Sequence, residues 1–386
     1  MILLACSLLK QAIAFEFFER GNTVSNSIQK NEGFNCPSCG HAMTHDPASG
    51  SLACPNCGHA LNACTQNTDH VDFDFGAIEN DAALHDWGVP VKTYACAGCS
   101  GKMVAAAMDS VTDCVFCSSP VSPIDESPGL HPDAMIPFKI DEAAAREKVS
   151  QWLGKRYLAP FPFKAEYAAG PLSGVFLPYW SFNARVNASY TGQAADSYTD
   201  TEINTVTGSD HTETKTKKVK KLRWRFVSGK LEKKFSNVIF NDVGPLDAKT
   251  LEKLEPYKLN ELVSCAPKHL TGYMAARAKS GVAAVWQRAL DYMGSEVRDE
   301  ITGIVKRGAD AVGAINTCAE YTNISYKQLL LPVWIGRYLY KKKVYRVYIN
   351  GQTGVIFGSS PKSVLKIGLI ALACAAVIAA LIFFVR

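Results

Sequence analysis

An uninterrupted apolar run near the C-terminus constrains this chain more than any other feature. From Ile367 to Val385 nineteen consecutive residues are apolar or small, and Arg386 follows them. As an α-helix this run would be about 28 Å long, close to the roughly 30 Å hydrocarbon core of a bilayer. A helix buried in a soluble protein normally keeps a polar side, and this segment has none. The sequence therefore predicts a transmembrane helix over residues 364–386.

Basic residues and cysteines both predict on which side of the membrane the rest of the chain lies. Lys362 and Lys366 precede the run, whereas Arg386 alone follows it, and positive residues remain cytoplasmic. There are thirteen cysteines, and the eight that form CxxC pairs are typical of a reducing compartment. We expect a single-pass, tail-anchored protein of the cell membrane with its bulk in the cytoplasm.

A second, shorter apolar stretch lies within residues 1–14. The segment from Ala12 to Ala14 resembles a signal-peptide cleavage site, but no positively charged region precedes it. Export would also conflict with reduced thiolates. We interpret residues 1–30 as an N-terminal tail. The sequence does not decide between residues 1–25 as part of the mature protein and residues 1–25 as the product of an over-long gene start.

Two pairs of CxxC turns repeat with the same spacing. In each pair fourteen residues separate the second cysteine of the first turn from the first cysteine of the next. Two such turns at the ends of a β-hairpin place four sulfurs around one zinc ion. The sequence predicts zinc ribbon 1 at 31–63, a linker at 64–90 and zinc ribbon 2 at 91–122, with two structural zinc ions. The predicted ligands are Cys36, Cys39, Cys54 and Cys57 in ribbon 1, and Cys96, Cys99, Cys114 and Cys117 in ribbon 2.

A redox role is the competing interpretation of the CxxC turns. It requires a single pair between a strand and a helix, and these short segments leave no room for such a unit. Four cysteine ligands also leave no open position for water or substrate, so we expect no catalytic metal.

Residues 130–360 are long enough for an α+β domain with antiparallel sheets. Asp141 is a predicted N-cap for a helix to about Tyr157, with Val149, Trp152 and Leu153 on the same face as Tyr157. Further helices are expected at roughly 247–256, 267–278 and 282–307, and strands at 174–182, 329–340, 344–349 and 355–357. Leu222, Trp224 and Phe226 alternate with arginines, which predicts a half-buried strand.

A short internal repeat predicts two related β units in this domain. The segment from Leu177 to Trp180, which leads to Gly192 and Gln193, resembles the segment from Leu331 to Trp334, which leads to Gly351 and Gln352. The predicted class is thus multidomain: two small β zinc ribbons, one α+β domain and one C-terminal transmembrane helix.

A basic stretch has three interpretations. Ten cationic residues lie between positions 215 and 234. They can form a solvated hairpin neutralised by preceding acids such as Asp196, Asp200 and Glu202, face an anionic membrane surface, or bind nucleic acid together with aromatic residues. The net charge of +5 argues against a dedicated nucleic-acid binder. The candidate residues for an anionic surface are Lys215, Lys217, Lys218, Lys220, Lys221, Arg223 and Arg225.

The sequence lacks the common catalytic signatures. It contains no Gly-rich phosphate loop, GxSxG elbow or HExxH motif, so no residue is assigned a catalytic role.

The chain resembles a family of bacterial proteins with N-terminal TFIIB-type zinc ribbons, some of which carry primosomal-replication-factor or helicase-like names. Besides the ribbons, the resemblance rests on Ile136-Pro137-Phe138-Lys139, Leu177-Pro178-Tyr179-Trp180, Arg223-Trp224 with Val227-Ser228-Gly229, and Leu331-Pro332-Val333-Trp334 with Asn350-Gly351-Gln352-Thr353-Gly354. The absence of any nucleotide-binding motif does not support a helicase. The resemblance implies an SPFH or flotillin-like protein as a partner. Ribbon 2 departs from the family's CxxCG pattern, because Ser100 and Ser118 follow the second cysteine of its two CxxC turns. This departure puts the binding partner of ribbon 2 in question and not its zinc ion.

These observations predict a non-enzymatic, membrane-tethered adaptor or scaffold. Its zinc ribbons would bind a cytoplasmic protein partner, and the α+β domain would separate them from membrane lipid. The alternative is a zinc-ribbon protein that binds nucleic acid at the membrane through the 215–234 hairpin.

Overall fold

A computed structural model describes most of the chain. The described residues are 36–41, 43–47, 51–61, 73–74, 87, 90–106, 111–129, 131–160, 163, 172–207, 212–265, 270, 272–341 and 343–385. The predicted tail at 1–30 lies outside them, as does most of the linker at 64–90.

Two sheets contain the described strands. A three-stranded sheet comprises β1 (Thr44–Asp46), β2 (Ser51–Ala53) and β3 (Ala60–Leu61). The other strands form a twelve-stranded sheet: β4 (Phe73–Asp74), β5 (Val91–Cys96), β6 (Lys102–Ala106), β7 (Val121–Ile124), β8 (Ala134–Met135), β9 (Leu172–Thr207), β10 (Thr212–Asn241), β11 (Val263–Ser264), β12 (Met274–Ala276), β13 (Ala311–Tyr340), β14 (Lys343–Asn350) and β15 (Ile356–Gly358). Four α-helices accompany them among the described residues: α2 (Glu142–Gly154), α4 (Ala248–Glu252), α5 (Val282–Arg307) and α6 (Val364–Val385). The prediction of a body with antiparallel sheets is confirmed.

The twelve-stranded sheet contains one β-α-β-β sequence of elements twice. The first is β8, α2, β9 and β10, and the second is β12, α5, β13 and β14. The two units exchange their short first strands, because β8 pairs in parallel with β13 and β12 pairs in parallel with β9. The order β8-β13-β9-β12 at the centre of the sheet therefore alternates between the units.

The repeated segments pair with each other at the middle of this sheet. Leu177 of β9 lies opposite Leu331 of β13, and the antiparallel register extends on both sides of this pair. An antiparallel register relates the two strands by a local two-fold axis, so each copy of the motif packs against the other. Both leucines are fully buried in the main core.

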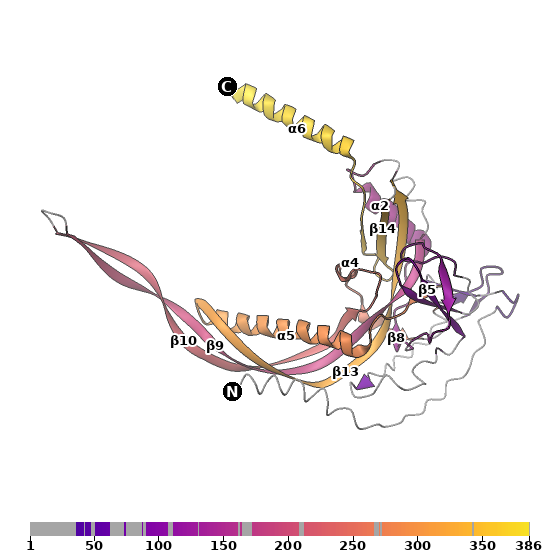
Figure 1. Ribbon diagram of the computed structural model, residues 1–386, viewed down its shortest axis with the longest axis horizontal. Coiled ribbons are helices and arrows are strands. Elements are labelled where there is room, and N and C mark those ends of the chain that lie inside the picture. Colours follow the sequence, from indigo (N-terminus) through magenta and orange to yellow (C-terminus); the bar gives the residue numbers. More distant parts are fainter. Residues whose placement is uncertain are drawn as a thin grey trace.

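The helices cover this sheet where the sequence has an apolar stripe. Asp141 caps α2 as predicted, since its carboxylate accepts a hydrogen bond of 2.7 Å from the backbone N–H of Ala144. Helix α5 lies along the three-stranded region of β10, β9 and β13 (Figure 1). Its buried residues recur every three or four positions, as a helix with one apolar face requires: Val282, Val285, Trp286, Ala289, Met293, Val297, Ile301 and Val305.

Two local predictions are wrong. Part of the helix expected at 267–278 is strand β12, which completes the sheet between β9 and β6, so tertiary pairing overrides local propensity. Tyr157 is 80% exposed rather than packed with Trp152, because α2 ends at Gly154.

Strands β9 and β10 extend beyond the rest of the sheet as an arm. The pairing of β13 with β9 stops at Ala195, whereas β10 stays paired with β9 as far as Thr207. The result is the long twisted two-stranded ribbon in Figure 1. Leu222, Trp224 and Phe226 lie at its base. The strand predicted for them is confirmed as part of β10, but they are 47%, 49% and 87% exposed, so the expected burial of their face is wrong.

Helix α6 projects from the body in Figure 1. It contains one stretch, Val364–Phe384, that is long and apolar enough to cross a membrane, and none of it is buried. Lys366 at its start donates hydrogen bonds from Nζ to the carbonyl oxygens of Tyr157 and Ala159, at 3.1 and 2.7 Å. The body thus contacts α6 at its first turn.

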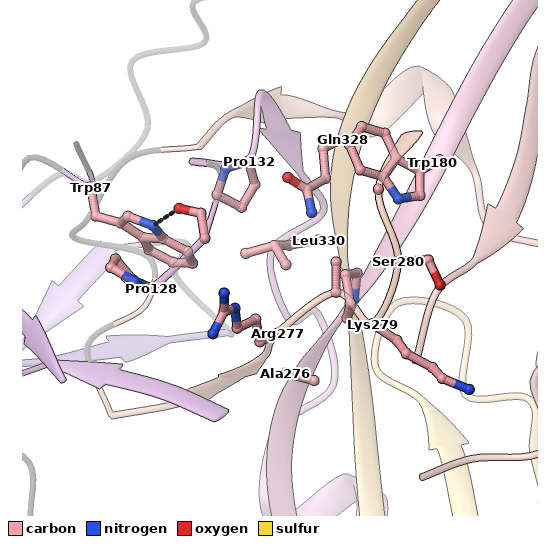
Figure 2. Close-up of a pocket in the computed structure, with 14 residues that line it drawn as sticks. Trp87, Pro128, Pro132, Trp180, Ala276, Arg277, Lys279, Ser280, Gln328 and Leu330 are labelled. Atoms are coloured by element: carbon pink, nitrogen blue, oxygen red, sulfur yellow. Dashed lines mark hydrogen bonds between the residues drawn. The ribbon is translucent and has the colours of Figure 1, made fainter. Parts of the chain in front are cut away.

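A cavity of about 320 Å³ lies between the two units and the segment that follows ribbon 2 (Figure 2). Trp87 and Trp180 line it, and their indole N–H groups already donate to the carbonyl of Gly129 and the carboxylate of Asp242. Its polar lining includes Arg277 and the buried Gln328, whose Oε1 accepts no hydrogen bond from the described residues.

The central leucine pair provides a stability test. We expect Leu177→Ala and Leu331→Ala each to lower the free energy of unfolding by about 2–5 kcal/mol, because each leaves a cavity in the buried core. The loss of unfolding free energy in the double variant should differ from the sum of the two single losses, since the two residues are cross-strand neighbours. Denaturant unfolding in detergent measures these changes. Leu222→Ala, at a half-exposed leucine, is the control and should change stability by less than about 0.5 kcal/mol; equal losses at all three positions would contradict the central packing.

Candidate metal centres

The four CxxC turns have the same backbone conformation. In each, the N–H of the first cysteine donates to the carbonyl five residues later, and the N–H four residues later donates back to the first cysteine. In ribbon 1 these bonds join Cys36 with His41 and Gly40, at 2.8 Å each. This closed turn places both cysteine sulfurs of a pair on one side of the chain.

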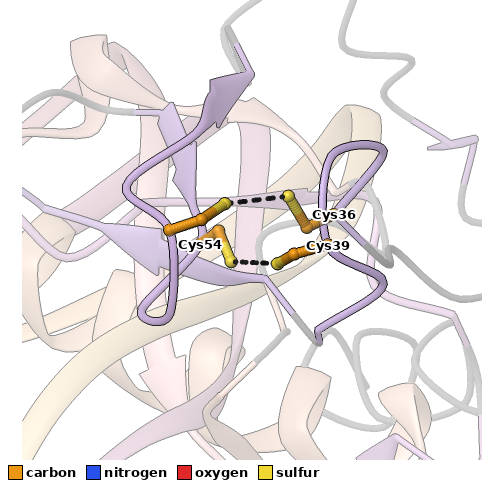
Figure 3. A group of neighbouring side chains, drawn as sticks. Cys36, Cys39 and Cys54 are labelled. Atoms are coloured by element: carbon orange, nitrogen blue, oxygen red, sulfur yellow. Dashed lines mark hydrogen bonds between the residues drawn. The ribbon is translucent and has the colours of Figure 1, made fainter.

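The turns bring eight sulfurs into two clusters. Cys36 and Cys57 are 3.4 Å apart at sulfur, and Cys39 and Cys54 are 3.5 Å apart (Figure 3). The corresponding distances in ribbon 2 are 3.3 Å for Cys96 and Cys117 and 3.6 Å for Cys99 and Cys114. All four sulfurs of each cluster lie within 4.8 Å of one another. A tetrahedral zinc ion with bonds of ~2.3 Å needs sulfurs about 3.8 Å apart, so both clusters fit this ion with small adjustments.

The thiol pKa values of ribbon 1 move in opposite directions. The backbone N–H of His41, followed by Cys54, lowers the pKa of Cys39 to about 6. At Cys57 the N–H of His59 favours the thiolate, but the neighbouring thiols Cys36 and Cys39 outweigh it and raise the pKa to about 12. Four packed thiols therefore cannot all ionise at neutral pH on their own, and a bound cation would remove this conflict.

Ribbon 2 uses serines where ribbon 1 uses glycines. The residue after the second cysteine has a positive φ in every turn: 72° at Gly40, 73° at Gly58, 56° at Ser100 and 67° at Ser118. Only glycine adopts this conformation without steric cost. The turn geometry is nevertheless retained in ribbon 2, so its departure from the CxxCG form leaves the sulfur cluster intact.

Ribbon 2 is built into the body. Its strands β5, β6 and β7 belong to the twelve-stranded sheet, and β6 pairs with β12. Arg337 of β13 donates from Nη1 to the carbonyl of Cys114, and Arg346 of β14 donates from Nε to the carbonyl of Phe116 at 2.9 Å. Burial lowers the pKa of Arg337, which nevertheless stays protonated at neutral pH. The two guanidinium groups lie beside a cluster that would carry a double negative charge around Zn²⁺.

Ribbon 1 has its own small sheet and its own small core. The core consists of Cys36, Met43, Leu52 and Cys54, whereas Cys39 and Cys57 are exposed. The strands of ribbon 1 form no pairs with the twelve-stranded sheet among the described residues. The two ribbons therefore share one turn geometry in different surroundings.

The structure distributes the candidate basic residues over two faces of β10. Lys221 pairs with Asp200 and Glu202 at 2.9 and 3.1 Å, and Arg225 pairs with Asp196 at 3.1 Å. Arg223 lies 5.1 Å from the ring centroid of Tyr198, and Lys217 is opposite Glu202 in the register. Lys218 and Lys220 lie on the other face, and Lys215 belongs to β10 but its side chain is outside the described part. The acids predicted to neutralise this hairpin therefore do so on one face.

Sequence reasoning missed the contacts that hold ribbon 2 to the body. Arg337 and Arg346 follow Cys114 by more than two hundred residues, and neither belongs to a motif. Gln328 and the wall of the cavity were also missed, since the sequence gives no sign that β13 passes beside the segment after ribbon 2.

Comparison with other proteins identifies one similar chain of undetermined function. It is "Uncharacterized protein YdjG" of Bacillus subtilis (strain 168), which is 24% identical over 234 residues. The match covers 61% of this chain and 65% of the relative, somewhat less than two thirds of its length. No family model matches the chain, and no solved structure matches it.

Removal of single cysteines tests the metal centres. We expect two zinc ions per chain by elemental analysis, and one in either Cys36→Ser or Cys114→Ser. Cys114→Ser should lower the thermal midpoint of the body more strongly, because Cys114 is fully buried and its turn is bound by Arg337. Equal midpoints for the two variants would contradict the different surroundings of the ribbons.

A glycine exchange tests the turn conformation. Ser100→Gly should raise the free energy of unfolding by up to about 1 kcal/mol, since it relieves a side chain in the left-handed region. Gly58→Ser should lower it by a similar amount, because open space around Gly58 leaves the backbone conformation as the main cost. Denaturant unfolding of each zinc-loaded variant is the measurement. An unchanged free energy of unfolding in both variants would show that the backbone conformation at these positions carries no cost.

Proposed function

We propose that this protein is a non-enzymatic adaptor that is tethered to the membrane by α6 and presents zinc ribbon 1 to a cytoplasmic protein partner. Zinc is the metal proposed for both clusters, because four thiolates in a tetrahedral arrangement suit it best. A closed shell of four cysteines has a structural role and no position for a substrate.

The separation of ribbon 1 from the main sheet is the observation that supports this proposal. Ribbon 2 contributes strands and buried residues to the body, including Val115 and Phe116 in the main core. Ribbon 1 adds none of its strands to that sheet, and the tips of its turns are exposed at Ser38 and Asn56. A metal-stabilised hairpin with free tips is a rigid surface that loses little conformational entropy on binding.

Membrane tethering is supported by the properties of α6. The helix leaves its apolar side chains uncovered along its whole length, which is unfavourable in water and favourable in a bilayer. The lysines before α6 and the CxxC spacing, which is typical of reduced metal-binding cysteines, support a cytoplasmic orientation. A partner of the SPFH or flotillin-like class is what the family resemblance implies.

Nucleic-acid binding is the second candidate function. The lysines and the aromatic residues on one face of β10 favour it, whereas the ion pairs on the other face of that strand reduce the charge available for phosphates. It predicts salt-sensitive retention of DNA or RNA by the protein. The enzymatic alternative would use the Trp87 cavity, whose lining includes Arg277, Lys279, Ser280 and Gln328.

Exchanges at the turn tips test the adaptor function. In the full-length protein, purified from solubilised membranes, Ser38→Glu with Asn56→Glu should abolish partner recovery while both zinc ions are retained. Ala97→Glu is the matched control at an exposed turn tip of ribbon 2, and it should leave recovery unchanged. Quantitative mass spectrometry of the recovered proteins is the measurement. Equal recovery with both variants, or release of the chain from membranes by carbonate washing, would overturn the proposal.

A further inference from the structure

We infer that one face of β10 is a docking surface for an anionic lipid bilayer. This outer face consists of Lys218, Lys220, Leu222, Trp224, Phe226 and Lys230. The inference rests on the proposed membrane tethering and adds a second, peripheral contact with lipid.

The outer face is opposite the face that carries helix α5. Lys233 of β10 pairs with Glu296 and Glu300 of α5, and Arg225 donates to the carbonyl of Gly308 at the end of that helix. Odd-numbered residues of β10 therefore point toward α5. The register of β10 with β9 is unbroken from Thr212 to Phe235, so even-numbered residues in this range point away from it. No described element packs on that side.

The charges of β10 differ between its two faces. On the face toward α5, Lys221, Arg225 and Lys233 all have carboxylate partners within 3.5 Å. On the outer face Lys218, Lys220 and Lys230 have no ion pair with any described residue and are exposed. The acids near this face are Glu232, which pairs with Arg185, the exposed Glu320 of β13 in the same cross-strand row, and Asp310, which accepts hydrogen bonds from Ser197 and also interacts with Lys220. The lysines therefore leave the outer face with a positive charge.

Three apolar side chains lie between these lysines. Trp224 rests against Gly313 of β13, where a Cβ would come within 3.0 Å of the indole, yet 49% of Trp224 remains exposed. Leu222 is 47% exposed and Phe226 is 87% exposed. Alternate positions of a strand share a face, so the three form one apolar strip with lysines on both sides.

This chemistry favours the lipid headgroup region over the other occupants. Tryptophan and phenylalanine between lysines are typical of segments that lie in the membrane interface, where the lysines contact anionic headgroups. Leu222 offers nothing for base stacking, which single-stranded nucleic acid would need at this position. A second copy of this chain would bring like charges together.

Photocrosslinking from the outer face tests the inference on the full-length protein. Benzoylphenylalanine replaces Phe226, and the protein is reconstituted into vesicles of phosphatidylcholine with or without ~30% phosphatidylserine. We expect phospholipid adducts that depend on phosphatidylserine. The same probe at Tyr292, an exposed aromatic residue on α5, should give few adducts.

Charge variants give the second readout. Lys218→Glu with Lys220→Glu should lower the adduct yield by more than about fivefold per lysine, because each exchange removes the roughly 1 kcal/mol that a lysine contributes near an anionic surface and adds a repelled carboxylate. Lys217→Glu with Arg223→Glu makes the same charge change on the face toward α5 and should have little effect. Two outcomes would overturn the lipid-docking inference and leave the proposed tethering intact. One is crosslinking to nucleic acid or to a protein in membranes from cells. The other is the absence of lipid adducts while the chain stays membrane-bound. Loss of the chain from the membrane would instead overturn the proposed tethering by α6, on which the inference rests.

Discussion

The antiparallel pairing of β9 with β13 is the constraint on which the rest of the structure depends. It places Leu177 against Leu331 at the centre of the sheet, and each strand then continues for many residues in opposite directions. One end of the pair accepts the strands of ribbon 2 and β14. The other end supports α5 and extends, through β10, into the arm. A strand pair of this length separates two regions of the protein without a flexible linker between them.

The two ribbons show how one metal-binding turn can serve two structural purposes. All four turns close with the same pair of backbone hydrogen bonds, which involve residues within five positions of each other. What differs is the environment beyond the turns. Ribbon 2 is fixed by Arg337 and Arg346 and buries Phe116 in the core, so its metal would stabilise the body itself. Ribbon 1 buries four residues of its own and lies close to the body at Thr44 and Gly272, so its metal would stabilise chiefly that module.

Features that depend on neighbouring residues could be predicted from the sequence, and those that depend on distant ones could not. The cysteine clusters, the Asp141 cap and helix α5 follow from spacing within a few turns of chain. Strand β12 was predicted as helix because its pairing with β9 and β6 is decided by residues far away. The docking of Arg337 on Cys114 has the same cause, since no local pattern specifies a contact across more than two hundred residues.

The wrong burial prediction at Leu222, Trp224 and Phe226 has a different cause. Alternation of apolar and charged residues identifies a strand with two unlike faces, and this part is correct. Alternation cannot identify which face is covered. In this strand the charged face lies toward α5 and forms ion pairs with Glu296 and Asp196, while the apolar face is left uncovered. Between Lys221 and Phe226 this arrangement is the reverse of a core strand, whereas Val227, Leu231 and Phe235 farther along β10 pack toward α5 as core residues do. Such an arrangement is expected where the outer face meets a partner that is itself apolar and anionic.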